Sequence, residues 1–109
     1  MSEYLVATGA RIRFDPERAT KADLFRGDTL FAGLNCFEPG QQQLVHAHAG
    51  AEKFYLLLTG KARLAVGERE VDAEAGDMVW APAGVPHGVV TVYERTTMLV
   101  AMAPPPRAR

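Results

Sequence analysis

The most informative stretch of this chain is residues 76–87, which read Gly-Asp-Met-Val-Trp-Ala-Pro-Ala-Gly-Val-Pro-His. After a glycine corner, Met78–Ala81 has the side chains of a short strand, and the Pro-Ala-Gly that follows breaks it. Gly84 and Pro86 act on the backbone and aim His87, which begins the next strand. The stretch therefore predicts a strand, a tight turn and a second strand that starts with an imidazole.

The same rhythm extends over most of the chain. Short runs rich in Val, Leu, Phe, Tyr and Thr recur about every 8 to 12 residues, with Gly or Pro between them, which is typical of all-β proteins. Besides Met78–Ala81, the predicted strands are Thr29–Phe37, Gln43–His48, Lys53–Thr59, Ala62–Val66, Arg69–Ala73, His87–Tyr93 and Thr97–Ala103. Gly67 and Glu68 form a hairpin turn between two of them. Strands this short must close on each other to avoid exposed edges, so we expect a jelly roll or barrel.

Length and composition predict a single domain. The chain has 109 residues, of which 48% are hydrophobic and 23% charged, the balance of a globular protein. We expect the barrel over residues 29–103 and a Pro-rich tail over 104–109. Residues 1–28 are an N-terminal extension or an edge strand of the same domain. Within them, Ile12–Phe14 is a candidate edge strand, and Pro16–Phe25 is either a turn of helix or an extended arm.

Charge and hydropathy exclude two classes of partner. The formal net charge is −1 and the 12 basic residues are not clustered, so we expect no nucleic acid. The apolar runs are far shorter than the roughly 20 residues of a membrane-spanning helix. The first residues do not resemble a secretory signal, and the single cysteine, Cys36, cannot form an internal disulfide. We therefore expect a cytoplasmic protein.

The chain has three histidines, and their spacing suggests one site. His46 and His48 lie two residues apart on a predicted strand, so both imidazoles face the same side. His87 begins a strand that a barrel can bring back over this pair. We expect His46, His48 and His87 to bind a divalent metal ion. The alternative is that the barrel holds no metal and the imidazoles only form hydrogen bonds in a polar cavity.

At these positions the sequence closely resembles the cupin family. In the first cupin motif a glycine is followed by five residues and His-x-His, which fits Gly40, His46 and His48. The second motif runs glycine, five residues, Pro-x-Gly, two residues and histidine. Residues 76–87 fit this spacing without a gap. The resemblance covers about Thr29–Ala103 and implies the double-stranded β-helix of small single-domain bacterial cupins. It also implies that the three histidines and a glutamate from the first motif surround Fe, Mn, Zn or Ni.

The chain departs from the cupin pattern at that glutamate. Counting forward from His48 places Glu52 there, whereas counting back from Gly60 places Lys53 there. The two are neighbours on a strand and point to opposite faces. We favour Lys53 at this position, with Glu52 as a ligand only if a bulge or loop turns it inward. The expected site then has three histidines and open positions, and Lys53 either turns aside or meets an anionic group of the ligand.

Two functions are compatible with these residues. One is a metal-dependent enzyme, dioxygenase-like or isomerase-like, acting on a small anionic metabolite, because an ion with open coordination positions can polarise or activate a substrate. The other is a non-catalytic cupin that binds or senses a small molecule, with or without metal.

Further pocket residues and the oligomeric state are also predicted. Tyr55 shares a strand face with Lys53, so both are pocket candidates. Gln41–Gln43 either border the cavity mouth or form a solvated turn. We expect a homodimer through the apolar face of Phe54, Leu56 and Leu58, as small cupins commonly pair.

Overall fold

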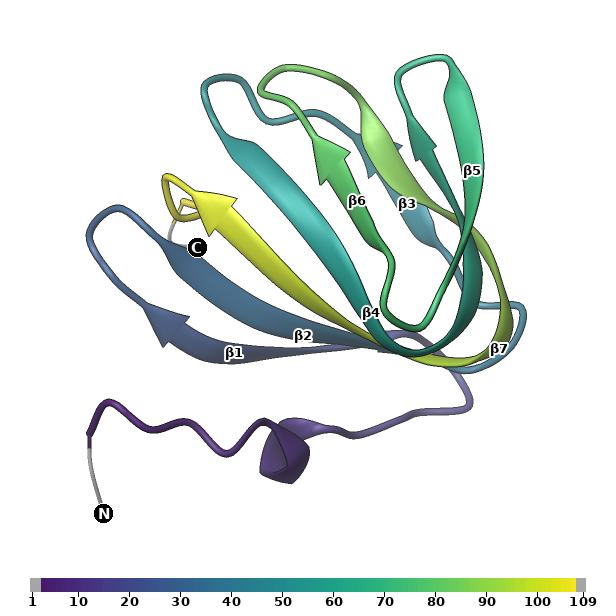
Figure 1. Cartoon of the computed structure of the whole chain (residues 1–109), viewed down its shortest axis with the longest axis horizontal. Helices are drawn as coiled ribbons and strands as arrows, with labels where there is room; N and C mark the ends of the chain where they lie inside the picture. The colour runs from purple at the N-terminus through teal and green to yellow at the C-terminus, as the bar shows by residue number, and fades with distance from the viewer. Residues whose placement is uncertain (1–2, 108–109) are drawn as a thin grey trace.

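The computed structural model describes residues 3–107, and nearly all of its regular structure is β-sheet (Figure 1). A short 3-10 helix, η1 (Thr8–Arg11), precedes seven strands. These are β1 (Thr20–Arg26), β2 (Phe31–Phe37), β3 (Gln43–His46), β4 (Glu52–Val66), β5 (Arg69–Glu74), β6 (Met78–Ala81) and β7 (His87–Ala103). Every strand pair is antiparallel. The predicted all-β class and the double-stranded β-helix are confirmed.

Two long strands organise the barrel. β4 and β7 have 15 and 17 residues and pair from Glu52 opposite Ala103 to Val66 opposite His87. The strand order is β1-β2-β7-β4-β5, with β3 added to β7 and β6 added to β4. Both long strands curve strongly, so they contribute to more than one wall of the barrel (Figure 1).

The prediction that each of these two strands is split in two was wrong. Gly60 was expected to end a strand, but it lies inside β4 with a φ of 84°. A Cβ at this position would overlap the side chain of Thr96 on β7, so only glycine allows the close approach. The pairing register shifts on both sides of Gly60, which marks a bulge rather than a strand end. Likewise, His87–Tyr93 and Thr97–Ala103 are parts of one strand, β7.

The N-terminal segment supplies an edge strand, but not at the first candidate position. Ile12–Phe14 is not a strand. The edge strand is β1, which begins at Thr20, within the segment for which helix or extended arm had been considered, and pairs with β2. The Arg11 guanidinium donates a hydrogen bond of 2.8 Å to the carbonyl oxygen of Asp23 and ties the preceding arm to β1. This arm runs alongside β1 and β2 (Figure 1).

The interior of the barrel changes from apolar to polar along its length. Alternation along β4 buries Tyr55 and Leu57, while Phe54 and Leu56 lie on the outer face. The buried cluster comprises Phe37, Tyr55, Leu57, Ala62, Leu64, Ala73, Val79, Val89, Val92, Met98 and Val100. Val100 also lines the cavity described below, so the apolar core forms the floor of that cavity.

The connection between β4 and β5 agrees with the sequence prediction. The hairpin predicted at Gly67 and Glu68 is present, because Val66 and Arg69 are paired between β4 and β5. Residues 3–107 contain no helix that is both long and apolar enough to cross a membrane.

Candidate metal centre

Three imidazole rings from two parts of the chain meet at one end of the barrel. β3 ends at His46, the next loop carries His48, and β7 begins at His87, which is paired with His46. The ring centroid of His46 lies 4.7 Å from that of His48 and 4.6 Å from that of His87, and the remaining distance is 5.6 Å. One nitrogen from each ring can be chosen so that all three lie within 4.8 Å of one another. The structure therefore brings together the three histidines that the sequence singled out.

Backbone hydrogen bonds orient two of the rings. Nδ1 of His46 lies 2.9 Å from the carbonyl oxygen of Leu44, and Nδ1 of His87 lies 2.9 Å from that of Val85. Because a carbonyl oxygen only accepts, each Nδ1 carries the hydrogen, and Nε2 keeps a free lone pair when the ring is neutral. Nε2 of His87 is buried and has no hydrogen-bond partner among the described residues. A buried acceptor without a partner is rare in proteins and points to a missing ligand.

Burial and neighbouring charges keep the rings of His48 and His87 neutral. The pKa of His48 is lowered mainly by burial and then by repulsion from His46 and the nearby lysines. Burial also lowers the pKa of His87, although its hydrogen bond to Val85 opposes the shift. Neutral imidazole is the form that binds metal ions, so both rings are in the required state at neutral pH.

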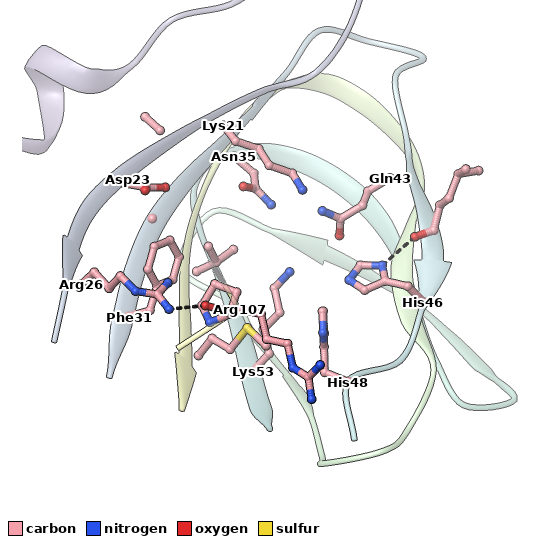
Figure 2. Close-up of a pocket in the computed structure, with 16 residues that line it drawn as sticks. Lys21, Asp23, Arg26, Phe31, Asn35, Gln43, His46, His48, Lys53 and Arg107 are labelled. Carbon is pink, nitrogen blue, oxygen red and sulfur yellow. Dashed lines mark hydrogen bonds between the residues drawn. The ribbon is translucent and has the colours of Figure 1, made fainter. Parts of the chain in front are cut away.

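His46 and His48 lie at the wall of an open cavity of about 890 Å³ (Figure 2), and His87 is buried behind them. Figure 2 shows side chains from four strands directed into the same space, namely Lys21, Asn35, Gln43, His46 and Lys53, with His48 beside them. A cavity of this size accommodates a small molecule.

Positive charge prevails on the cavity walls. The charged side chains among the described lining residues are Lys21, Asp23, Arg26, Lys53 and Arg107. Four of these five are cationic, and low-dielectric walls of one sign concentrate ligands of the opposite sign. The cavity is therefore suited to an anionic molecule.

Comparison with known sequences connects this site to a family. Residues 33–102 match the sequence model of the family described as Cupin domain. The match covers more than half of the chain and includes His46, His48 and His87. The chain belongs to the cupin family.

Solved structures and a curated relative match this cupin over nearly its whole length. TT1209 from Thermus thermophilus is 35% identical with a TM-score of 0.87, covering 94% of this chain and 98% of that one. An RmlC-like cupin from Desulfovibrio desulfuricans is 27% identical with a TM-score of 0.81, covering 97% and 98%. The uncharacterized protein SCO3923 from Streptomyces coelicolor is 29% identical over 104 residues, 95% of this chain and 89% of that protein. The two solved structures share the barrel over nearly their whole length, and none of the three names specifies a reaction.

The three-histidine site of this cupin fits a divalent metal ion. Three neutral imidazoles suit Zn, Fe, Ni and similar ions, and an ion would satisfy the buried Nε2 of His87. Bonds of about 2.1 Å limit two nitrogens on one ion to a separation of about 4.2 Å. Since the present nitrogens lie within 4.8 Å of one another, small movements of the rings are sufficient.

Lys53, and not Glu52, faces the histidines. Lys53 lines the cavity, and its Nζ lies 4.6 Å from the centroid of the Tyr55 ring. Burial, and then repulsion from Lys21, lowers the pKa of Lys53 to about 8. Glu52 is exposed and accepts a hydrogen bond of 3.0 Å from Nε1 of Trp80. The structure does not bring Glu52 to the three histidines, because no bulge turns it inward.

Tyr55 and the glutamines have mainly positioning roles. Tyr55 is buried, and its hydroxyl donates a hydrogen bond of 2.8 Å to Oε1 of Gln43. Burial raises the pKa of Tyr55 well above its ordinary value, so it stays protonated. Gln43 lines the cavity, whereas the Gln41 amide nitrogen donates to the backbone of Asp15 in the N-terminal arm. Tyr55 therefore holds Gln43 at the cavity wall.

Several cavity residues were not found from the sequence. Lys21 and Asn35 are paired between β1 and β2, and both line the cavity. Arg26 donates a hydrogen bond to the carbonyl oxygen of Pro106, which keeps the tail beside the cavity so that Arg107 lines it. The available signal was strand alternation from Thr20 onward, which places charged side chains at alternate positions of β1.

Proposed function

We propose that this cupin binds a divalent metal ion through His46, His48 and His87 and is an enzyme acting on a small anionic molecule. The observation that best supports the metal is the buried Nε2 of His87, which has two other imidazoles nearby and no partner among the described residues. A divalent ion held by three histidines supplies Lewis-acid or redox chemistry at its open positions. A dioxygenase-like or isomerase-like reaction is the class we favour.

The cavity walls would bind and orient the substrate. The side-chain amides of Asn35 and Gln43 offer hydrogen-bond donors and acceptors at the wall, and Tyr55 fixes Gln43. Val100 and Met102 provide an apolar surface beside them. A few fixed polar groups on an apolar wall orient a small ligand while excluding water from most of its surface.

One observation favours a second candidate function, the binding of a small molecule without turnover. Lys53 stands where the cupin pattern has a carboxylate ligand, and in residues 3–107 no carboxylate joins the three histidines. Losing an anionic ligand lowers the affinity for a metal ion and changes its reactivity. A cupin that binds a metabolite would keep the cavity and its positive charge. We place either function in the cytoplasm, where the buried free thiol of Cys36 stays reduced.

Metal content tests the first part of the proposal. Protein purified without chelators is analysed by elemental analysis, and we expect close to one divalent ion per chain in the wild type. His48→Ala and His87→Ala should each lose most of it, since two imidazoles bind far more weakly than three. Gln42→Ala, an exposed change on the neighbouring turn, serves as control. Metal at trace level in the wild type, or full retention in both histidine variants, would contradict metal binding.

A test of turnover distinguishes the proposed enzyme from a protein that binds a small molecule without converting it. Iron-loaded protein is tested for oxygen consumption, and in parallel for product formation, with a panel of small carboxylates, thiols and diketones. Turnover that is lost in His87→Ala supports the enzyme. Thermal stabilisation by a compound of which no product forms supports the non-catalytic function instead.

A further inference from the structure

Two lysines from opposite walls face into the cavity beside the histidines. Lys53 projects from β4 and Lys21 from the edge strand β1, and both ammonium groups point into the shared space (Figure 2). Strand alternation fixes these directions: Lys21 is paired with Asn35 and Lys53 with Met102, and all four side chains line the cavity. The two charges are thus built into the barrel wall and do not depend on a loop.

Neither lysine has an anionic partner in the described part of the chain. The ion pairs of residues 3–107 involve Lys61, Arg63 and Arg95, all on the outer surface. Nζ of Lys53 lies over the face of the Tyr55 ring, which offers a weak interaction for an ammonium group that is largely removed from water. Asp23 also lines the cavity, yet it forms no ion pair with either lysine. The site therefore lacks the negative charge that would balance it.

The lysines are also close enough to influence each other and the histidines. After burial, repulsion from Lys21 is the next cause that lowers the pKa of Lys53. The charges of both lysines contribute, after burial and His46, to the lowered pKa of His48. Like charges held together at the end of a cavity are unfavourable in the free protein and become favourable when an anion binds between them.

We infer that Lys53 and Lys21 form an oxyanion subsite that binds a carboxylate or phosphate group of the ligand next to the three histidines. The ligand supplies the negative charge that the cupin pattern places on the protein, and the amides of Asn35 and Gln43 flank the same space. This inference rests on the proposed function in that the same cavity holds the ligand, but the subsite consists of protein side chains and requires no metal.

Anion binding by the metal-free protein tests the inference. Wild-type protein is treated with EDTA, dialysed and titrated with malonate and, separately, with inorganic phosphate by isothermal calorimetry at neutral pH, with ionic strength held constant by NaCl. Lys53→Met and Lys21→Met each remove one charge, and we expect each to weaken binding about tenfold or more, as for the loss of a charge-assisted hydrogen bond. Lys53→Arg keeps the charge and should retain binding within a few-fold. Lys61→Met, an exposed change on the same strand, is the matched control and should bind like the wild type.

The outcomes separate this subsite from the metal. Binding of malonate alone identifies a carboxylate site, and binding of phosphate alone identifies a phosphate site; either result supports the subsite if both lysine variants lose it. Lys21 lies on an exposed edge strand, so its variant keeps the test valid if Lys53→Met does not fold. No binding of either anion to the wild type, or equal binding by Lys21→Met and Lys61→Met, overturns the inference. Metal content measured before EDTA treatment reports on the metal site alone, so that either proposal can fail without the other.

Discussion

Lys53 lowers the stability of the ligand-free cupin. Its ammonium group is partly buried, is repelled by Lys21 and has the Tyr55 ring as its nearest favourable contact. A pKa lowered from 10.5 to about 8 corresponds to a cost of about 3 kcal/mol for keeping the side chain charged in the folded state. Such a cost is typical of a residue that is retained for binding rather than for folding.

Lys53→Met is therefore expected to stabilise the metal-free protein. Methionine has a similar length and no charge, so the free energy of unfolding at pH 7 should rise by about 1 to 3 kcal/mol, measured by denaturant titration. Lys61→Met, whose ammonium is exposed, should change it by less than about 0.5 kcal/mol. A loss of stability in Lys53→Met would show that the charge is balanced by an interaction within the protein.

The pH dependence of stability gives an independent check on the same side chain. Folded Lys53 releases its proton near pH 8, whereas in the unfolded chain it does so near 10.5. Between these pH values the unfolded chain binds more protons at Lys53 than the folded chain does. The contribution of Lys53 to the free energy of unfolding therefore rises with pH. Denaturant titrations across this range should show a gain in the wild type relative to Lys53→Met. A difference between the two proteins that stays constant with pH would contradict this.

The histidines predict the behaviour on the acid side. The pKa values of His48 and His87 are lowered, chiefly by burial, from an ordinary value of 6.5. Below that value the unfolded chain takes up protons that the folded rings resist, so the metal-free protein loses stability as pH falls. Thermal unfolding of EDTA-treated protein should show this fall as the pH drops below 6.5, and a shallower fall in His87→Gln, which does not titrate there. Equal slopes for the two proteins would argue against it.

At the scale of elements, Gly60 joins β4 to β7 at their closest approach. The φ of 84° and the contact with Thr96 both require glycine. Gly60→Ala should lower the free energy of unfolding by about 3 kcal/mol, because backbone strain and overpacking add. Gly76→Ala is a matched control, since Gly76 has a φ of 95° but open space around it, and should cost about 1 kcal/mol. Equal losses in a thermal or chemical denaturation series would mean that the contact with Thr96 contributes nothing.

The elements also show why part of the structure could be predicted from the sequence. Residues 76–87 have turn residues and a strand pattern that act locally, so the short strand and the start of β7 at His87 were correct. The continuity of β4 was missed, because whether Gly60 ends a strand or allows a bulge depends on Thr96 in another strand.

The edge strand β1 was missed for a different reason. Residues 21–24 alternate polar and apolar, with Lys21 and Asp23 lining the cavity and Ala22 paired with buried Leu34. This alternation ends at the register shift between Asp23 and Phe25, so it is too short to separate a strand from the helix or extended arm considered for this segment. The pattern also does not say which face lines a cavity, so Lys21 was missing from the predicted site, whereas Lys53 could be placed because strand parity separates it from Glu52.

At the scale of the whole molecule, the outer face of β4 and β6 is an apolar surface. Phe54 is paired with Trp80 and Leu56 with Met78, and Trp80 and Met78 are 62% and 57% exposed. The homodimer predicted from Phe54, Leu56 and Leu58 remains a prediction. This apolar surface is its predicted interface.

Light scattering coupled to gel filtration checks the oligomeric state. At micromolar concentration we expect twice the mass of one chain, and Met78→Glu should shift the mass toward that of a monomer because it buries a charge in the contact. Leu5→Glu, a similar change on the exposed N-terminal arm, is the control and should leave the mass unchanged. A monomeric wild type would refute the homodimer.

The central place of β7 has a consequence for how the protein is assembled in the cell. β7 pairs with β2, β3 and β4, all of which leave the ribosome before it. Until β7 emerges, those three strands lack the partner strand that covers one of their backbone edges, and exposed edges of this kind favour pairing with other chains. Because His87 arrives only with this strand, the imidazole trio is completed last, and the metal ion that we propose for this site would be acquired by a finished barrel instead of guiding its formation.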